Sequence, residues 1–273
     1  PEHPLAHDVA GSRESIRGIS REELLQYMAW GYTPERAVLS VAGPVTHSQV
    51  RDLSEPLLHD WSGADGVRPT PVAALEGPVA CVTRRPIEQS HLVIGLRGPS
   101  RQEDARFAFS LLNTLLGDGM SSRLFTEIRE ERGLAYSIYS SATNFHDTGA
   151  FSIYAGVDSD NLHDTIQATL QQLHRLREEP VGDEELAMTK AYARGRTLLR
   201  LEDSGANASW VGGQLALTGE ILTPDEVLAR VDAVTTEEIQ AVARRFFRDD
   251  QLVMSLVGPV AEEADWPSLL RVE

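Results

Sequence analysis

One segment of the chain gathers the residues whose types and spacing could do chemistry. It runs from Gly117 to Ser141 and reads GDGMSSRLFTEIREERGLAYSIYSS. A glycine-rich turn leads to a helix N-terminus at Ser121 and Ser122, arginines follow along that helix, and Tyr136 begins the next strand. A glycine turn before a helix can cradle phosphate, but no Lys-Ser or Lys-Thr pair follows it, which disfavours a nucleotide site.

Taken alone, the same segment also allows ordinary structural roles. Tyr136 shares a strand face with Leu134 and Ile138, a pattern typical of a core tyrosine whose hydroxyl is satisfied. The arginines stand among several glutamates, a pattern typical of a solvated ion-pair face. Residue physics by itself therefore favours structural roles over catalytic ones.

Histidine spacing gives no metal site. The chain has eight histidines but neither H-E-x-x-H nor H-x-x-E-H, the helical spacings that place two imidazoles around zinc. His3 and His7 are separated by Pro4 in a segment with no helix start, and His163 and His174 lack a carboxylate or cysteine at ligand spacing. We expect no metal ligand in this chain and no zinc bound to it.

The elements that must position these residues form a mixture of strands and helices. Alternation, amphipathic spacing and caps predict an α+β fold with an antiparallel-rich sheet packed under helices. The expected strands are Val79–Arg84, His91–Gly98, Leu134–Ala142 and Ala150–Val157. The expected helices are Glu103–Leu116, Ser122–Glu131 stopped by Gly133, one marked by Leu162, Ile166, Leu170 and Leu173, Glu184–Leu201, and one opened by Thr223-Pro224.

Two stretches of the chain are similar at a constant offset. Ile19–Val45 aligns without gaps to Val234–Val260, 215 residues later, and both end in Gly-Pro-Val. Each copy has a capping box, Ser20 with Glu23 and Thr235 with Glu238, which predicts a helix. A short apolar strand is expected after each helix, at Ala37–Ala42 and Leu252–Val257.

This repeat predicts two tandem related domains, the first truncated and the second complete. We expect residues 1–62 to be the C-terminal remnant of a first domain, 63–75 to be a linker and 76–273 to be the second domain. The chain is then the back part of a longer protein, and it is expected to associate with its own N-terminal half or a homologous subunit as a homo- or hetero-oligomer.

The amino-acid composition limits the classes of molecule that this chain is expected to bind. Asp plus Glu number 41 against 25 for Lys plus Arg, a net charge of -16 in 273 residues. Phosphate backbones are repelled by such a chain, so nucleic acid is disfavoured, and basic peptides or metal cations are favoured. No apolar run reaches the ~18 residues of a membrane helix. Cys81 has no internal disulfide partner. The chain starts without Met or a signal-peptide hydrophobic region, so this end does not decide targeting, and the expected location is the cytoplasm.

The segment GMSSRLFTEIREERGLAYSIYS resembles the second-domain signature of the insulinase/pitrilysin family of zinc metallopeptidases, which includes the mitochondrial processing peptidases. The resemblance covers nearly the whole chain, since the stretch from His3 to Val50 is similar to the end of the family's first domain. It implies a clamshell of two related domains enclosing a peptide substrate, with zinc held by an H-x-x-E-H motif upstream of this chain.

The resemblance also implies roles for particular residues. Arg129 and Tyr136 match an Arg and a Tyr seven positions apart, which are expected to be catalytic. The phenol would donate to the oxyanion formed from the scissile carbonyl, and the guanidinium would hold a substrate carbonyl or orient the tyrosine. Met120, Ser121, Ser122 and Arg123 are expected to contribute to substrate binding.

Three functions remain open at this stage. The leading hypothesis is that this chain is the C-terminal portion of a zinc metalloendopeptidase, inactive by itself, whose parent requires zinc. The alternative is a metal-free partner or structural subunit of the same family, with a peptide-binding or assembly role. A third is a peptide-binding module that uses an exposed sheet edge.

Overall fold

The computed structural model describes residues 3–63, 70–73, 77–260 and 265–272. The chain divides into two compact units. The first comprises Pro1–Ala73 with Leu198–Leu222, and the second comprises Ala74–Thr197 with Thr223–Glu273. The expected linker at 63–75 lies largely outside the described residues, so the expected domain boundaries stay a prediction.

The second unit is built on one five-stranded sheet, ordered β1-β5-β2-β4-β3. All neighbours are antiparallel except β1 and β5, which run parallel. The sheet confirms the α+β class and the four strands expected between residues 79 and 157. The strands are β1 Val79–Arg84, β2 Ser90–Gly98, β3 Ala135–Asn144, β4 Gly149–Val157 and β5 Val253–Gly258.

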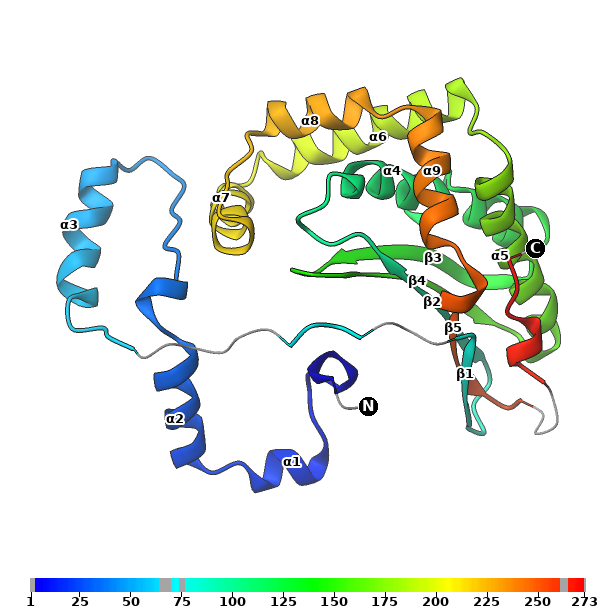
Figure 1. Cartoon of the computed structure of the whole chain (residues 1–273), viewed down its shortest axis with the longest axis horizontal. Helices are drawn as coiled ribbons and strands as arrows, with labels where there is room; N and C mark the ends of the chain where they lie inside the picture. Colours follow the sequence, from blue (N-terminus) through cyan, green and yellow to red (C-terminus); the bar gives the residue numbers. More distant parts are fainter. Residues whose placement is uncertain (1–2, 64–69, 74–76, 261–264, 273) are drawn as a thin grey trace. The chain divides into compact units, whose positions relative to one another are not determined.

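Helices of this unit lie together on one side of the sheet (Figure 1). Helix α4 packs on β3, and α9 packs on α4, α5 and β2. The longer helices confirm those expected from amphipathic spacing and from the Thr223 cap. They are α4 Ala105–Gly117, α5 Leu162–Glu178, α6 Asp183–Arg200, α8 Pro224–Ala233 and α9 Thr236–Phe246, with short 3-10 turns at Ser159–Asn161, Asp249–Gln251 and Pro267–Leu269.

The period-2 alternation of the strands decides which side chains enter the core. In β2, Leu92, Ile94 and Leu96 are buried under the helices, while the alternating positions His91 and Val93 are only half-buried. The half-buried side chains project from the opposite side of the sheet, because successive residues of a strand point to opposite faces. This opposite side, which carries His91, Val93 and Gly95 of β2 and their cross-strand neighbours, is called the open face below.

The first unit is helical. Its helices α2 and α3 begin with capping boxes, and in the first of these the Ser20 backbone N–H donates to Glu23 at 2.8 Å and lowers the pKa of that carboxyl. Helix α7 was not expected, because its glycines disfavour helix in isolation. The elements are α1 Arg13–Gly18, α2 Arg21–Gly31, α3 His47–Leu58 and α7 Ser204–Thr218, with 3-10 turns at Pro4–Ala6 and Pro34–Arg36.

The structure reproduces only part of the repeat predicted between Ile19–Val45 and Val234–Val260. Helices α2 and α9 both have the predicted capping box, and each is followed by a 3-10 turn at the same offset. The strand expected at Ala37–Ala42 is wrong: this segment pairs with no strand among the described residues. It lies against α7 instead, where a Cβ on Gly212 would stand 2.7 Å from Ser40 Cβ. An isolated extended segment has no neighbour to complete its hydrogen bonds.

Gly117, the last residue of α4, allows the end of this helix to lie close to the backbone of β3. A Cβ there would lie 2.5 Å from the backbone nitrogen of Ser140, whose hydroxyl donates to Asn113 Oδ1 at 2.9 Å. We predict that Gly117→Ala lowers the free energy of unfolding by about 1–3 kcal/mol, because β3 must shift away.

Gly195 within α6 is the matched control. Among the described residues, no atom lies within 4 Å of a Cβ added there, the helix's own backbone aside. Gly195→Ala is expected to raise stability by about 0.5–1 kcal/mol. Thermal unfolding followed by circular dichroism checks both, and a Gly117→Ala protein as stable as the wild type would contradict the close approach.

Candidate functional site

The helix expected at Ser122–Glu131 is present but is wound differently over most of its length. Residues Phe125–Glu131 form a π-helix, here called η3. The wider winding appears in the backbone bond from the Arg132 N–H to the Glu127 carbonyl, 3.2 Å long, which spans five residues. Such windings are rare and occur frequently at functional sites. Gly133 follows with φ +63°, the left-handed conformation expected of a helix stop.

The inner side of η3 is anchored to α5. Ile128 is fully buried, and the Glu127 carboxylate accepts from Arg132 at 2.8 Å and from Arg175 at 3.5 Å. Gln172, itself fully buried, also donates to that carboxylate. Hydrogen bonds to charged groups contribute about 1.5–3 kcal/mol each when they are sheltered from water. Hydrogen bonds from Gln172 and Arg175 of α5 to Glu127 therefore fix the backbone that carries Arg129.

Arg129 lies on the outer side of η3. Its side chain is 43% exposed, and the guanidinium carbon lies 4.7 Å from the ring centre of Phe125. Its contact with Glu130 is long, at 3.7 Å. A guanidinium resting on an aromatic ring keeps its N–H donors at the ring's periphery. Arg129 is thus oriented and still able to bind an oxygen ligand.

Tyr136 stands in a β-bulge. Ala135 pairs with Val157, Ser137 pairs with Gly156, and Tyr136 between them is the extra residue of β3. Its side chain is 60% exposed, so the interpretation as a core tyrosine is wrong. The physical reason is the bulge, which breaks the alternation that would have placed Tyr136 with the buried Ile138. Bulges often redirect a side chain next to an active site.

Arg129 and Tyr136 therefore belong to one local unit. Gly133 joins the end of η3 to the start of β3, and both side chains are solvent-accessible while Ile128 and Ala135 beside them are buried. The predicted R-x6-Y pair thus has the exposure that a substrate-contacting pair requires.

The glycine turn forms one wall of a second feature, a cavity of about 370 Å³. Met120 and Ser121 are exposed there, whereas Ser122 is buried and its hydroxyl donates to the Gly119 carbonyl at 2.7 Å. Ser122 thereby closes the turn. The lining comprises Thr114, Leu115, Asp118, Gly119, Met120, Ser121, Ser122, Glu185, Met188, Thr189 and Tyr192.

Arg123 holds that turn against α6. Its guanidinium makes two 2.7 Å bonds to the two carboxylate oxygens of Glu185, and its side chain is only 15% exposed. A bidentate pair of this kind is geometrically specific. Of the four residues expected to bind substrate, Met120 and Ser121 offer accessible atoms and Ser122 is a buried part of the lining. Arg123 does not line the cavity and acts on it only by holding Glu185.

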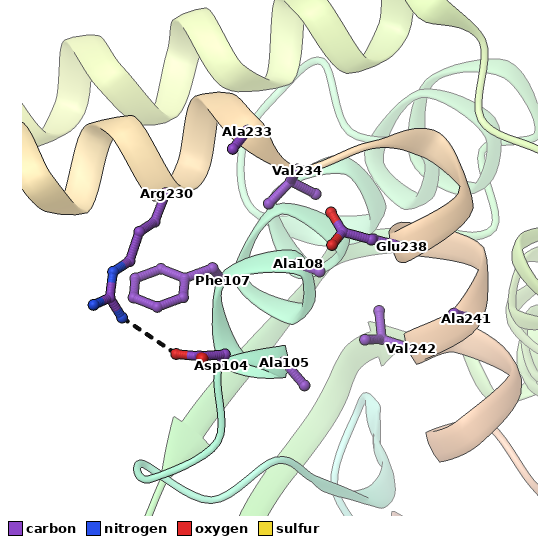
Figure 2. A pocket seen from close by; sticks show the side chains of 10 residues that line it. All are labelled: Asp104, Ala105, Phe107, Ala108, Arg230, Ala233, Val234, Glu238, Ala241 and Val242. Carbon is purple, nitrogen blue, oxygen red and sulfur yellow. Dashed lines mark hydrogen bonds and ion pairs between the residues drawn. The ribbon is translucent and has the colours of Figure 1, made fainter.

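A further cavity of about 420 Å³ lies between α4, α8 and α9 (Figure 2). Arg230 pairs with Asp104 at 3.2 Å there and stacks over Phe107. None of the predicted site residues lines this cavity. Its charged groups include this satisfied pair, and no serine, threonine, cysteine, lysine or histidine is among its lining residues.

Metal ligands are not assembled in the part of the chain that the structure describes: it holds no group of three or more His, Cys, Asp or Glu that could bind a metal ion. The helices described there are also too short or too polar to cross a lipid bilayer.

Residues 18–192 match the family model described as "Peptidase M16 inactive domain". The chain belongs to the M16 peptidase family. An uncharacterized zinc protease of Mycobacterium leprae is 33% identical over 279 residues, covering 99% of this chain and 62% of the relative. The chain therefore spans less than two thirds of that relative's length.

Solved structures share the fold of this M16 chain. A peptidase M16 inactive domain from Pseudomonas fluorescens matches with a TM-score of 0.84 and 20% identity, covering 96% of this chain and 63% of the other. A chain of complex III2 from Candida albicans matches with a TM-score of 0.78 and 19% identity, covering 97% and 65%. The resemblance found in the sequence is thus confirmed at the level of family and fold.

Sequence reasoning missed the residues that support the site. Glu185 lies 62 residues from Arg123, and Gln172 lies 45 residues from Glu127. A glutamine among the leucines of α5 was a usable signal, because a buried amide requires a polar partner. Its partner could be identified only once η3 and α5 were packed together.

The Arg123 pair generates a stability prediction. Arg123→Met keeps an unbranched stem and removes both bonds to Glu185, so we expect a loss of about 1–3 kcal/mol and a lower Tm. Arg194→Met in α6 is the control, since Arg194 pairs with Asp232 at 3.0 Å with both side chains about half exposed. That surface pair should contribute about 0–1 kcal/mol. Equal losses in the two variants would show that Arg123 does not fix the turn.

Proposed function

We propose that this chain is the C-terminal, substrate-binding portion of a zinc metalloendopeptidase. The observation that carries the proposal is the exposure of Tyr136 from a β-bulge directly after the anchored helix that presents Arg129. A tyrosine built only for packing would not be left 60% exposed beside a buried alanine.

The assigned chemistry follows from these two groups. The Tyr136 hydroxyl donates to the peptide oxygen as negative charge develops on it, and Arg129 binds a neighbouring substrate carbonyl. A donor held in place before the reaction stabilises the transition state without a cost of reorganisation. The net charge of -16 favours peptides that carry arginine or lysine.

Zinc belongs to the longer protein in this proposal. Relatives bearing the name zinc protease support it, and the described residues of this chain do not fit a zinc site. We therefore assign this chain peptide binding and oxyanion stabilisation. The metal ligands are proposed to come from its own N-terminal half or from a homologous subunit in a homo- or hetero-oligomer, located in the cytoplasm.

A second candidate is a metal-free partner or structural subunit. This candidate is supported by the similarity to a chain of complex III2 from Candida albicans, because that chain has the same fold and is part of an assembly. An H-x-x-E-H motif in the upstream coding sequence supports the peptidase, and degenerate residues at those positions support the subunit.

The test uses the full-length gene product. Tyr136→Phe removes one hydroxyl from an exposed side chain, so Tm should be unchanged, while peptide turnover should fall about a hundred- to thousandfold. Arg129→Ala should act more on KM than on kcat. Tyr139→Phe is the control, because Tyr139 is another exposed tyrosine of β3. Full turnover in Tyr136→Phe, or a loss that follows unfolding, would contradict the catalytic assignment.

A further inference from the structure

The open face of the sheet carries a polar cluster close to Tyr136. His91 Nδ1 and the Tyr154 hydroxyl are 2.8 Å apart, joining β2 to β4. We propose that His91 and Tyr154 form a second peptide-binding site, which hydrogen-bonds one backbone amide of an extended substrate. This inference rests on the proposed function and extends the contact surface of the same substrate.

The strand register places the cluster beside the bulge. His91 pairs with Gly156 of β4, and Gly156 pairs with Ser137 of β3. Directly paired residues point to the same face of a sheet. Ser137 follows Tyr136 in the chain, so the row His91, Gly156, Ser137 ends at the bulge that exposes Tyr136.

Gly156 is what allows these side chains to converge. A Cβ at this position would lie 3.0 Å from Ser137 Oγ, 3.3 Å from the Tyr154 hydroxyl oxygen and 3.7 Å from Gln89 Oε1. Three polar atoms from three separate segments therefore surround the one residue of the row that has no side chain. Because the φ of Gly156 is not positive, this space is the feature that alanine would remove.

The hydrogen-bonding capacity of the pair matches that of a peptide group. If the hydroxyl donates to Nδ1, a neutral imidazole keeps an N–H on Nε2 and the tyrosine oxygen keeps an acceptor site. If Nδ1–H donates instead, Nε2 becomes the acceptor and the hydroxyl proton is free. In either case one donor and one acceptor remain, and within the described part of the chain no group binds Nε2 of His91.

Neighbouring groups on the open face favour a polypeptide over a charged small molecule. The Tyr154 ring lies on this face, and one row further along, the Ser141 and Ser152 hydroxyls bond at 2.9 Å. Aromatic rings supply contact area with little conformational entropy to lose, and hydroxyls adapt to backbone donors and acceptors. These rows contain no acidic or basic side chain apart from His91.

The experiment measures binding of a fluorescein-labelled, unstructured, arginine-containing peptide to this chain by fluorescence anisotropy. Tyr154→Phe keeps the ring and removes the hydroxyl, so we expect affinity to fall about threefold to tenfold, the effect of one uncharged hydrogen bond. Gly156→Ala should weaken binding similarly. Thermal unfolding establishes that each variant is folded.

Each variant has a control on the same face. Tyr139→Phe removes the hydroxyl of a neighbouring exposed tyrosine, and Gly95→Ala adds a Cβ whose nearest atom is at an ordinary 3.7 Å. Both should bind the peptide as the wild type does. A probe methylated at its backbone nitrogens should bind the wild type more weakly, because in either tautomer the acceptor of the pair then has no amide N–H to accept.

The outcomes separate this inference from the proposed function. The second site is refuted if Tyr154→Phe binds the peptide as tightly as the wild type. It is also refuted if Tyr154→Phe loses no more affinity than Tyr139→Phe. If the wild-type chain does not bind the probe, the second site is also refuted. The catalytic assignment depends instead on the turnover of Tyr136→Phe, so it can survive either result or fail independently.

Discussion

The half-buried carboxylate of Glu127 makes the interactions on which the site depends. It accepts hydrogen bonds from Arg132, Arg175 and Gln172. The bonds from Arg175 and Gln172 connect the π-helix η3 to α5. Loss of this anchor would leave Gln172 buried without its partner, a cost that falls on the packing of α5 as well as on η3. The same fixed backbone places Arg129 on the outer side of η3, and the bulge at Tyr136 follows directly after it.

The sheet imposes a second constraint, because its two faces serve different purposes. Alternation buries Leu92 and Ile94 under the helices and leaves His91 on the open face. The bulge in β3 adds Tyr136 to the exposed residues without disturbing the core, since Ala135 and Ile138 stay buried on either side. The core residues and the residues that we propose to bind a peptide therefore lie on opposite sides of the same strands.

Local patterns predicted most of the second unit. Val79–Arg84 was predicted with its observed ends, and Phe151, Ile153, Ala155 and Val157 are all buried as their alternation required. The same patterns failed in two places. Ala37–Ala42 has strand-like composition but pairs with no strand in the part of the chain that the structure describes, and α7 is a helix despite its glycines. In both cases the neighbours, which local sequence does not encode, overrode local propensity.

The sequence by itself determined the family and the α+β class, since a long motif and its periodicity are properties of consecutive residues, and it singled out Arg129 and Tyr136 as the predicted site residues. The tertiary structure alone decided that Tyr136 is exposed, that Arg123 pairs with Glu185, and that His91 meets Tyr154 63 residues away. The physical reason is that a bulge, a partly buried ion pair and a cross-strand contact each depend on which distant segment lies opposite. Only the folded register of the sheet and the packing of α5 and α6 specify those partners.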